Sequence, residues 1–197
     1  MRDLFRLMSS ELMLGLVAVV GIFALINRAD ADWGLETLDD GTTLAVLFDA
    51  VQPEDSSVPT ADAYCIKSTG GDVEAGFAIA TVLKAKGKPV YYTQALSIAA
   101  SIAVETNAEP LNEEAILGFH WTYSAASQGR YVPDAESQAV MLRVWNSIDK
   151  KWGTKVGTKI KGAMIKIVSA DQRTSMVVIN AKGQYMIIKN NKPLDVN

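Results

Sequence analysis

Short buried strands alternate with helices between residues 43 and 121, and this alternation constrains the fold of the chain more than any other feature. The clearest unit begins at Ala63–Lys67, an apolar run typical of a buried strand. Asp72 is a residue type that caps helix N-termini and Gly87 is a type that ends helices, so we expect a helix over Val73–Lys86. A further strand follows this helix at once, and a strand, helix, strand unit places its two strands parallel in one sheet. The expected fold class is therefore α/β, with a mixed sheet covered by helices.

Periodicity and turn residues predict the remaining elements of this domain. The expected strands are Thr43–Asp49, Lys88–Thr93 and Ala115–Trp121, with a hairpin formed by Met176–Ile179 and Gln184–Ile188. The expected helices are Leu96–Thr106, Pro133–Trp152 and Val156–Val168, and Gln52–Thr60 is expected to be a loop. The apolar side of the helix at Pro133–Trp152 is predicted to carry Ala139, Leu142, Val144, Trp145 and Ile148.

Composition narrows the classes of function that the chain can have. Its 197 residues, 49% of them hydrophobic, suffice for one well-packed domain. The net charge is −3 and no basic stripe is visible, so we expect no nucleic-acid partner. Cys65 is the only cysteine and lies in an apolar run, which predicts a buried thiol and excludes an internal disulfide. Because the chain has only one cysteine and one histidine, we expect no metal site held by these residue types. We also expect no cofactor.

The N-terminal segment differs from the rest of the chain. Leu12–Ile26 carries no charge and follows two arginines, which is typical of a secretory signal peptide. Ala29 and Ala31 have the small-x-small spacing of a cleavage site, so we expect a division into residues 1–31 and a domain at 32–197. The protein would then be periplasmic or secreted. The alternatives are an uncleaved anchor in the inner membrane, formed by residues 12–26, and a buried core helix.

His120 is the only histidine, and it ends an expected strand. Imidazole is the side chain whose ordinary pKa suits proton transfer near neutral pH, so any histidine base in this protein must be His120. Gly70 and Gly71 lie between a strand and a helix, where free backbone N–H groups attract negative charge. Ser101 lies in a run of small residues. Taken singly, each of these features is also typical of ordinary turn or core chemistry.

Taken together and in order, three segments resemble those of the ClpP-like serine proteases, within the ClpP/crotonase superfamily. Ser68-Thr69-Gly70-Gly71-Asp72-Val73-Glu74-Ala75-Gly76 is similar to their Ser-Pro-Gly-Gly-x-Val-x-Ala-Gly segment, with Thr69 in place of the proline. Ala99-Ala100-Ser101-Ile102-Ala103 is similar to their nucleophile segment, and Gly118-Phe119-His120 matches the place of their catalytic histidine. The likeness covers Thr43 to Tyr123 and is strongest to exported bacterial ClpP-like proteins. It implies a spiral of strand-strand-helix units behind an N-terminal hydrophobic helix.

The resemblance also implies roles for individual residues. Ser101 would be the nucleophile, His120 its general base, and the backbone N–H of Ile102 would form an oxyanion hole with Gly70 or Gly71. The family's aspartate follows its histidine by about fifty residues, which favours Asp171 as the third member. Asp149 and Asp134 suit this role less well, and a backbone carbonyl or a water molecule could replace the carboxylate.

These roles predict an exported serine peptidase that acts on peptides or proteins through an acyl-enzyme. The same resemblance implies a homo-oligomer, no cofactor, and contact with a membrane only through the N-terminal segment. One alternative is a non-catalytic member that serves as a binding or assembly module. Another is a crotonase-type acyl-CoA enzyme, which the short chain and the lack of suitably placed glutamates disfavour.

Overall fold

The computed structural model describes residues 33–123 and 125–194. The expected signal segment, its cleavage site and the N-terminal hydrophobic helix lie outside the described residues. In the part of the chain that is described, no helix is long and apolar enough to cross a membrane.

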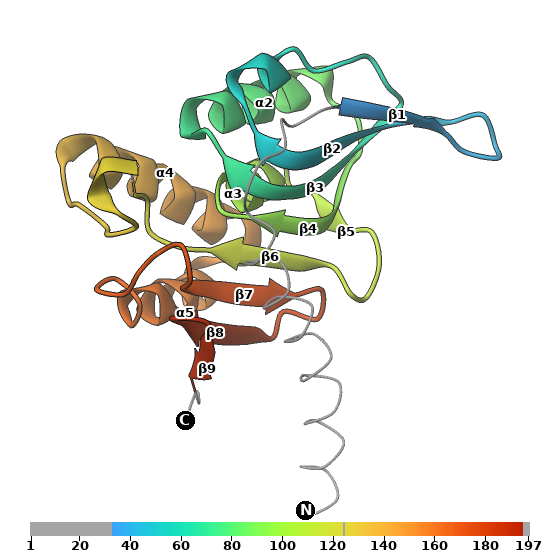
Figure 1. The fold of residues 1–197 in the computed structure, drawn as a ribbon. Helices are drawn as coiled ribbons and strands as arrows, with labels where there is room; N and C mark the ends of the chain where they lie inside the picture. The colour runs from blue at the N-terminus through green and yellow to red at the C-terminus, as the bar shows by residue number, and fades with distance from the viewer. Residues whose placement is uncertain (1–32, 124, 195–197) are drawn as a thin grey trace, which may run out of the picture.

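The domain is built on one mixed sheet (Figure 1). Its strands are β1 (Trp33–Thr37), β2 (Thr43–Val51), β3 (Ala63–Gly71), β4 (Val90–Leu96), β5 (Glu109–Pro110), β6 (Ile116–Phe119), β7 (Met176–Asn180), β8 (Tyr185–Lys189) and β9 (Lys192–Leu194). They lie in the order β1-β2-β3-β4-β6-β7-β8-β9, with β5 paired to β4 outside this path. The pairs from β2 to β6 are parallel, whereas β1 and the strands from β7 onward are antiparallel to their neighbours. The predicted mixed sheet is confirmed.

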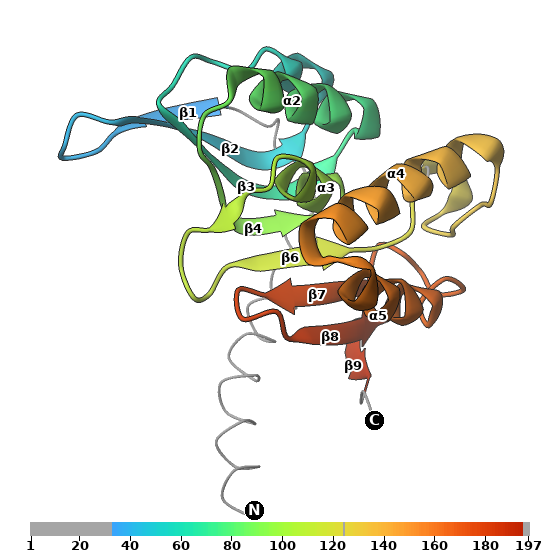
Figure 2. The same ribbon diagram turned by 180° about the vertical axis from the view of Figure 1, so that it is seen from behind.

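Helices cover one face of this sheet, as Figure 2 shows from behind. They are α2 (Val73–Lys86), α3 (Ile98–Glu105), α4 (Ala135–Trp152) and α5 (Thr154–Ile165), with short 3-10 turns at Pro53–Ser56 and Ala125–Ser127. The main hydrophobic core lies between the helices and the sheet. Two smaller clusters of buried apolar side chains also lie on the sheet, one around Met176 and one around Cys65.

The strand-helix-strand unit forms where the sequence predicts it. Asp72 accepts a hydrogen bond from the backbone N–H of Ala75 at 2.8 Å, and Gly87 ends α2 in the left-handed conformation with φ 61°. Cys65 is buried, as predicted, and burial raises the pKa of its thiol to about 11. A thiol with this pKa stays protonated near neutral pH, so Cys65 is no nucleophile there.

The structure corrects several details of the prediction. Strands β1, β5 and β9 were not expected, because two are very short and the exposed β1 lacks an apolar pattern. On α4, Ala139 and Leu142 are exposed and not buried, since the side that faces the core carries Met141, Val144 and Ile148. The prediction is therefore confirmed for Val144 and Ile148, wrong for Ala139 and Leu142, and it missed Met141.

Candidate active site

The carboxyl ends of the parallel strands β3, β4 and β6 meet at one edge of the sheet. A cavity of about 230 Å³ lies there, lined by the ends of these strands and by α3 and α4. This edge is where parallel α/β sheets most often bind ligands. The cavity contacts Gly70, Gly71, Ser101 and His120, so the structure brings these predicted residues to one place.

Two glycines form the side of the cavity at the end of β3. Gly70 has φ 94° and Gly71 has φ 150°, values that L side chains rarely adopt. A Cβ on Gly70 would overlap Cβ of Ser97, and a Cβ on Gly71 would overlap the backbone oxygen of Val51. Glycine is therefore needed at both positions. At Gly70 the absence of a side chain lets the backbone pack directly against Ser97.

Ser97 lies between β4 and α3 and was not predicted as a site residue. It is the N-cap of α3, with φ 56° and ψ −127°, a conformation that is strained for any residue other than glycine. Its backbone N–H donates to the carbonyl oxygen of Gly118 at 2.8 Å, two residues before His120. Its hydroxyl makes no capping hydrogen bond, although that is the usual role of an N-cap serine. A half-buried hydroxyl on a strained strand-to-helix turn has the geometry of a hydrolase nucleophile.

Ser101 lies one helical turn further along α3. It contacts the same cavity, but only 3% of its surface is exposed and its backbone is regular helix. The cavity thus holds two serines, one strained at the helix start and one packed inside the helix. Neither is hydrogen-bonded to His120 in the described part of the chain.

The only imidazole has a defined tautomer. Nδ1 of His120 lies 2.7 Å from the carbonyl oxygen of Trp121, and because a carbonyl can only accept, Nδ1 carries the proton. Nε2 is then unprotonated, and it has no hydrogen-bond partner among the residues described. Burial lowers the pKa of His120 below its ordinary value of 6.5, against a smaller opposing effect of the bond to Trp121. The ring also packs near Tyr123, with centroids 5.4 Å apart. His120 is therefore neutral at pH 7 and can accept a proton at Nε2.

Gln172 fixes the backbone beside His120, a role that no sequence pattern indicates. Its side chain is fully buried, and its Oε1 accepts from the backbone N–H of Trp121 at 3.0 Å. Its Nε2 donates to the carbonyl oxygens of Ile167 at 2.6 Å and Ala170 at 2.9 Å. The carboxamide is thus held at both ends, and it fixes the backbone N–H of Trp121, the residue whose carbonyl orients His120.

The three aspartates considered for the third position all have other partners. Asp171 forms a two-point ion pair with Arg173, with its Oδ2 2.6 Å from Nη2, and this pairing holds the pKa of Asp171 below its usual range. Asp149 pairs with Lys161, and Asp134 caps α4 through the backbone N–H of Ser137. Nδ1 of His120 is bonded instead to a backbone carbonyl.

Two of the backbone N–H groups predicted for the oxyanion hole are engaged or directed elsewhere. The N–H of Gly70 donates to Oγ of Ser68 at 3.2 Å. Ile102 is the fifth residue of α3, where helix geometry directs the N–H to the carbonyl four residues earlier. Ile98 is the first residue of α3, and its N–H has no intrahelical partner.

Comparison with solved structures finds a likeness to a mutant of ClpP1 from Listeria monocytogenes. The two are 17% identical, the alignment covers 61% of this chain and 78% of that chain, and the TM-score is 0.42. No family model matches the sequence, and no curated protein matches it. A likeness at this level carries no weight for the site, which rests on the geometry described above.

Proposed function

We propose that this protein is a serine hydrolase of ClpP-like fold that cleaves peptide bonds through an acyl-enzyme, with Ser97 as nucleophile and His120 as general base. The observation that carries the proposal is the conformation of Ser97, a strained N-cap whose hydroxyl does not cap its helix. Strain of this kind persists where the surrounding structure imposes it, and it is concentrated at active sites. Here the backbone of Gly70 and the carbonyl of Gly118 hold Ser97 in place.

The first chemical step joins these two residues. Oγ of Ser97 attacks the carbonyl carbon of the substrate while Nε2 of His120 takes the hydroxyl proton. The tetrahedral intermediate collapses as the C–N bond breaks, and the protonated imidazole gives its proton to the leaving amine. Water then attacks the acyl carbon while His120 accepts a proton from it, and as the bond between the acyl carbon and Oγ breaks, His120 gives this proton to Oγ. The carboxylic acid product is released and free Ser97 is restored.

Negative charge develops on the substrate oxygen, and backbone donors must be in place to receive it. The N–H of Ile98 suits this role because it follows the nucleophile and begins α3, where the helix dipole also favours an anion. Gly71 lies across the same cavity and is exposed, so its N–H is the second candidate donor. Relative to the sequence prediction, the helix donor moves from Ile102 to Ile98 because the nucleophile moves from Ser101 to Ser97.

The carbonyl of Trp121 takes the place that an aspartate occupies in a triad. It fixes the tautomer and the ring orientation of His120, which are two of the three tasks of that aspartate. A neutral carbonyl stabilises the imidazolium less than a carboxylate does, so we propose a slow enzyme. Asp171 remains the sequence-based candidate for the third position, and its use would require that it leave Arg173.

The substrate class and location follow from the sequence and not from the cavity. We propose peptide or protein substrates, export to the periplasm or beyond, and assembly into a homo-oligomer. Anchoring in the inner membrane through residues 12–26 is the alternative to cleavage of the signal segment. Expression of the full chain with fractionation, followed by intact mass, would test export and cleavage after Ala31.

A fluorophosphonate probe tests the catalytic proposal, since it labels only an activated serine. We expect labelling of the wild type and of Ser101→Ala, and loss of labelling in Ser97→Ala and His120→Ala. If labelling survives in Ser97→Ala and is lost in Ser101→Ala, the nucleophile is Ser101, as the sequence predicted. If the folded wild type is not labelled at all, the hydrolase proposal fails and a non-catalytic binding module becomes the better explanation.

A further inference from the structure

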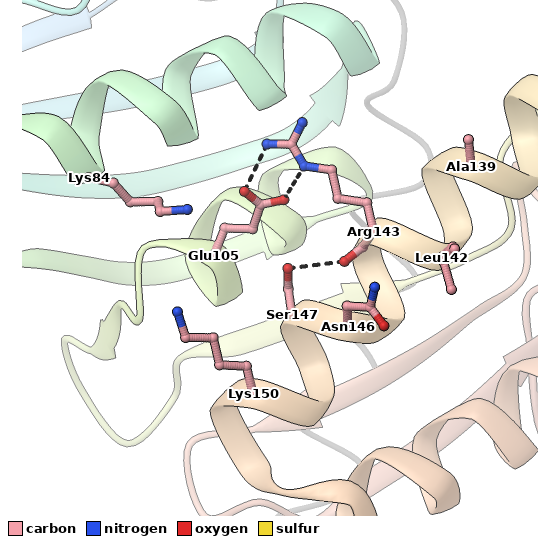
Figure 3. Close-up of a pocket in the computed structure, with 8 residues that line it drawn as sticks. All are labelled: Lys84, Glu105, Ala139, Leu142, Arg143, Asn146, Ser147 and Lys150. Carbon is pink, nitrogen blue, oxygen red and sulfur yellow. Dashed lines mark hydrogen bonds and ion pairs between the residues drawn. The ribbon is translucent and has the colours of Figure 1, made fainter.

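A second hollow lies on the helical side of the domain, away from Ser97. It is an open groove of about 450 Å³ between the ends of α2 and α3 and one side of α4. Figure 3 shows the side chains that line it. Three of them are cationic, Lys84, Arg143 and Lys150, and a single carboxylate, Glu105, accompanies them. The groove is therefore positively charged on a protein whose net charge is −3.

The arginine of this groove is held in a fixed position. Nε and Nη2 of Arg143 donate to the two oxygens of Glu105 at 2.6 and 2.9 Å, and this carboxylate side chain is only 5% exposed. The guanidinium also lies over the ring of Phe77, 3.7 Å from its centroid. Arg143 and Glu105 thus neutralise each other and form a rigid wall.

The two lysines are left without a counter-ion. Within residues 33–123 and 125–194, neither Lys84 nor Lys150 forms an ion pair or a hydrogen bond through its ammonium group. Both extend toward the end of α3 that carries Glu105, as Figure 3 shows. Ammonium groups are compact point charges that bind phosphate oxygens, and the guanidinium of Arg143, which could also bind phosphate, is already engaged by Glu105. The free charges in this groove therefore fit a compact dianion.

The other end of the groove is apolar. Ala139 and Leu142 line it from α4, and Leu142 is 57% exposed. A volume of this size lies within the range of small-molecule sites. The exposed Leu142, which broke the predicted pattern of α4, thereby has a use as a contact for the organic part of a ligand.

We infer that this groove binds a small phosphate monoester, with the phosphate on Lys84 and Lys150 and its organic group against Leu142. The inference is independent of the proposed hydrolase, since no residue of the groove contacts the cavity at Ser97. A phosphate monoester could also be presented by a lipid headgroup such as phosphatidic acid. Within the described part of the chain, Ala139 and Leu142 are the only apolar side chains that line the groove, a small apolar area that favours the organic group of a free small molecule over lipid chains.

Phenyl phosphate is a suitable probe, because it joins a dianion to an apolar ring. Isothermal titration of the wild type with phenyl phosphate should show saturable binding, and benzoate, with the same ring and one charge, should bind more weakly. Loss of a hydrogen bond to a charged group weakens binding about tenfold or more. The double variant Lys84→Gln/Lys150→Gln should therefore bind phenyl phosphate at least about tenfold more weakly.

The matched control is Lys155→Gln/Lys159→Gln, which removes the same charge from exposed lysines on α5, outside the groove. This control should bind phenyl phosphate as the wild type does, and circular dichroism should show both variants folded. Equal affinity in the groove variant and the control overturns the inference, as does the absence of saturable binding to the wild type. Binding to vesicles that contain phosphatidic acid, without binding of phenyl phosphate, would also overturn it and would identify a lipid site.

Discussion

Two strand-to-helix junctions lie side by side at the same edge of the sheet, and they obey different rules. At the junction of β3 and α2, Asp72 has an extended backbone with φ −64°, and its side chain caps the helix. At the junction of β4 and α3, Ser97 has φ 56°, and its side chain caps nothing. Both residue types are good N-caps, so local preference does not explain the difference.

The difference lies in what surrounds each junction. Asp72 meets solvent, whereas Ser97 is confined between the backbone of Gly70 and the carbonyl of Gly118. One junction stabilises its helix, whereas the other is strained and leaves its hydroxyl without a capping bond in the cavity that His120 also lines. Departures from local rules are expected at functional sites, and Ser97 is such a departure.

The largest expected effect is on kcat, which should fall on mutation of Ser97 at one junction and stay nearly unchanged on mutation of Asp72 at the other. Ser97→Ala should lower kcat on an ester or peptide substrate by about 10⁴-fold, because the nucleophile is lost while binding remains. Asp72→Ala should leave kcat within about twofold, since the lost cap affects the stability of α2 and no reacting atom. Steady-state kinetics on both variants would measure this. A similar loss in the two variants would show that the contrast between the junctions is only structural.

The second prediction concerns the glycine that confines Ser97. Gly70→Ala should lower the free energy of unfolding by about 3 kcal/mol, because the new Cβ overlaps Ser97 and the backbone has φ 94°. Gly87→Ala is the matched control: its φ is 61°, but no atom lies within 4 Å of the added Cβ. It should cost about 1 kcal/mol, from the backbone alone. Urea denaturation would measure both values, and equal costs would mean that the contact with Ser97 is loose.

The third prediction concerns pH. Because burial holds the pKa of His120 below 6.5, the base stays neutral at pH 6.5, and activity should fall only at lower pH. Below that pKa, kcat/KM should drop about tenfold for each pH unit. A half-maximal point above pH 6.5 would contradict the buried, neutral imidazole.

The same shift makes His120 a small contributor to stability. The unfolded chain takes up the proton first as pH falls, so this contribution is complete above the unfolded pKa and is lost as pH falls through the lower, folded pKa. His120→Gln should therefore show less loss of stability than the wild type over that range of pH.

The sequence predicted the parts of the fold that depend on neighbouring residues. Helix α2 begins and ends as its Asp72 cap and Gly87 indicate, because both signals act within one turn of the helix. The same approach missed where α3 begins. The run Leu96–Thr106 is uniformly apolar and small, so nothing local marks Ser97 as the N-cap rather than a helical residue.

From the sequence, the site could be predicted only through the order of its residues along the chain. Gly70, Gly71 and His120 were placed together by their order at strand ends, and the structure brings them to one cavity. The contact between Trp121 and Gln172 joins residues 51 positions apart, and no sequence pattern indicates such a pairing. The strain at Ser97 likewise depends on contacts from two other strands.

The smallest expected effect is the most direct test of strain at the β4–α3 junction. Ser97→Gly removes the Cβ that a positive φ disfavours, so it should raise the free energy of unfolding by about 1 kcal/mol even as it abolishes turnover. Asp72→Ala should change stability by a similar amount in the opposite direction, because there the side chain supports the helix. Thermal or urea denaturation of the two variants measures both signs. Destabilisation by Ser97→Gly would mean that the serine stabilises this junction as Asp72 stabilises the other, and the conformation of Ser97 would then no longer favour it over Ser101 as the nucleophile.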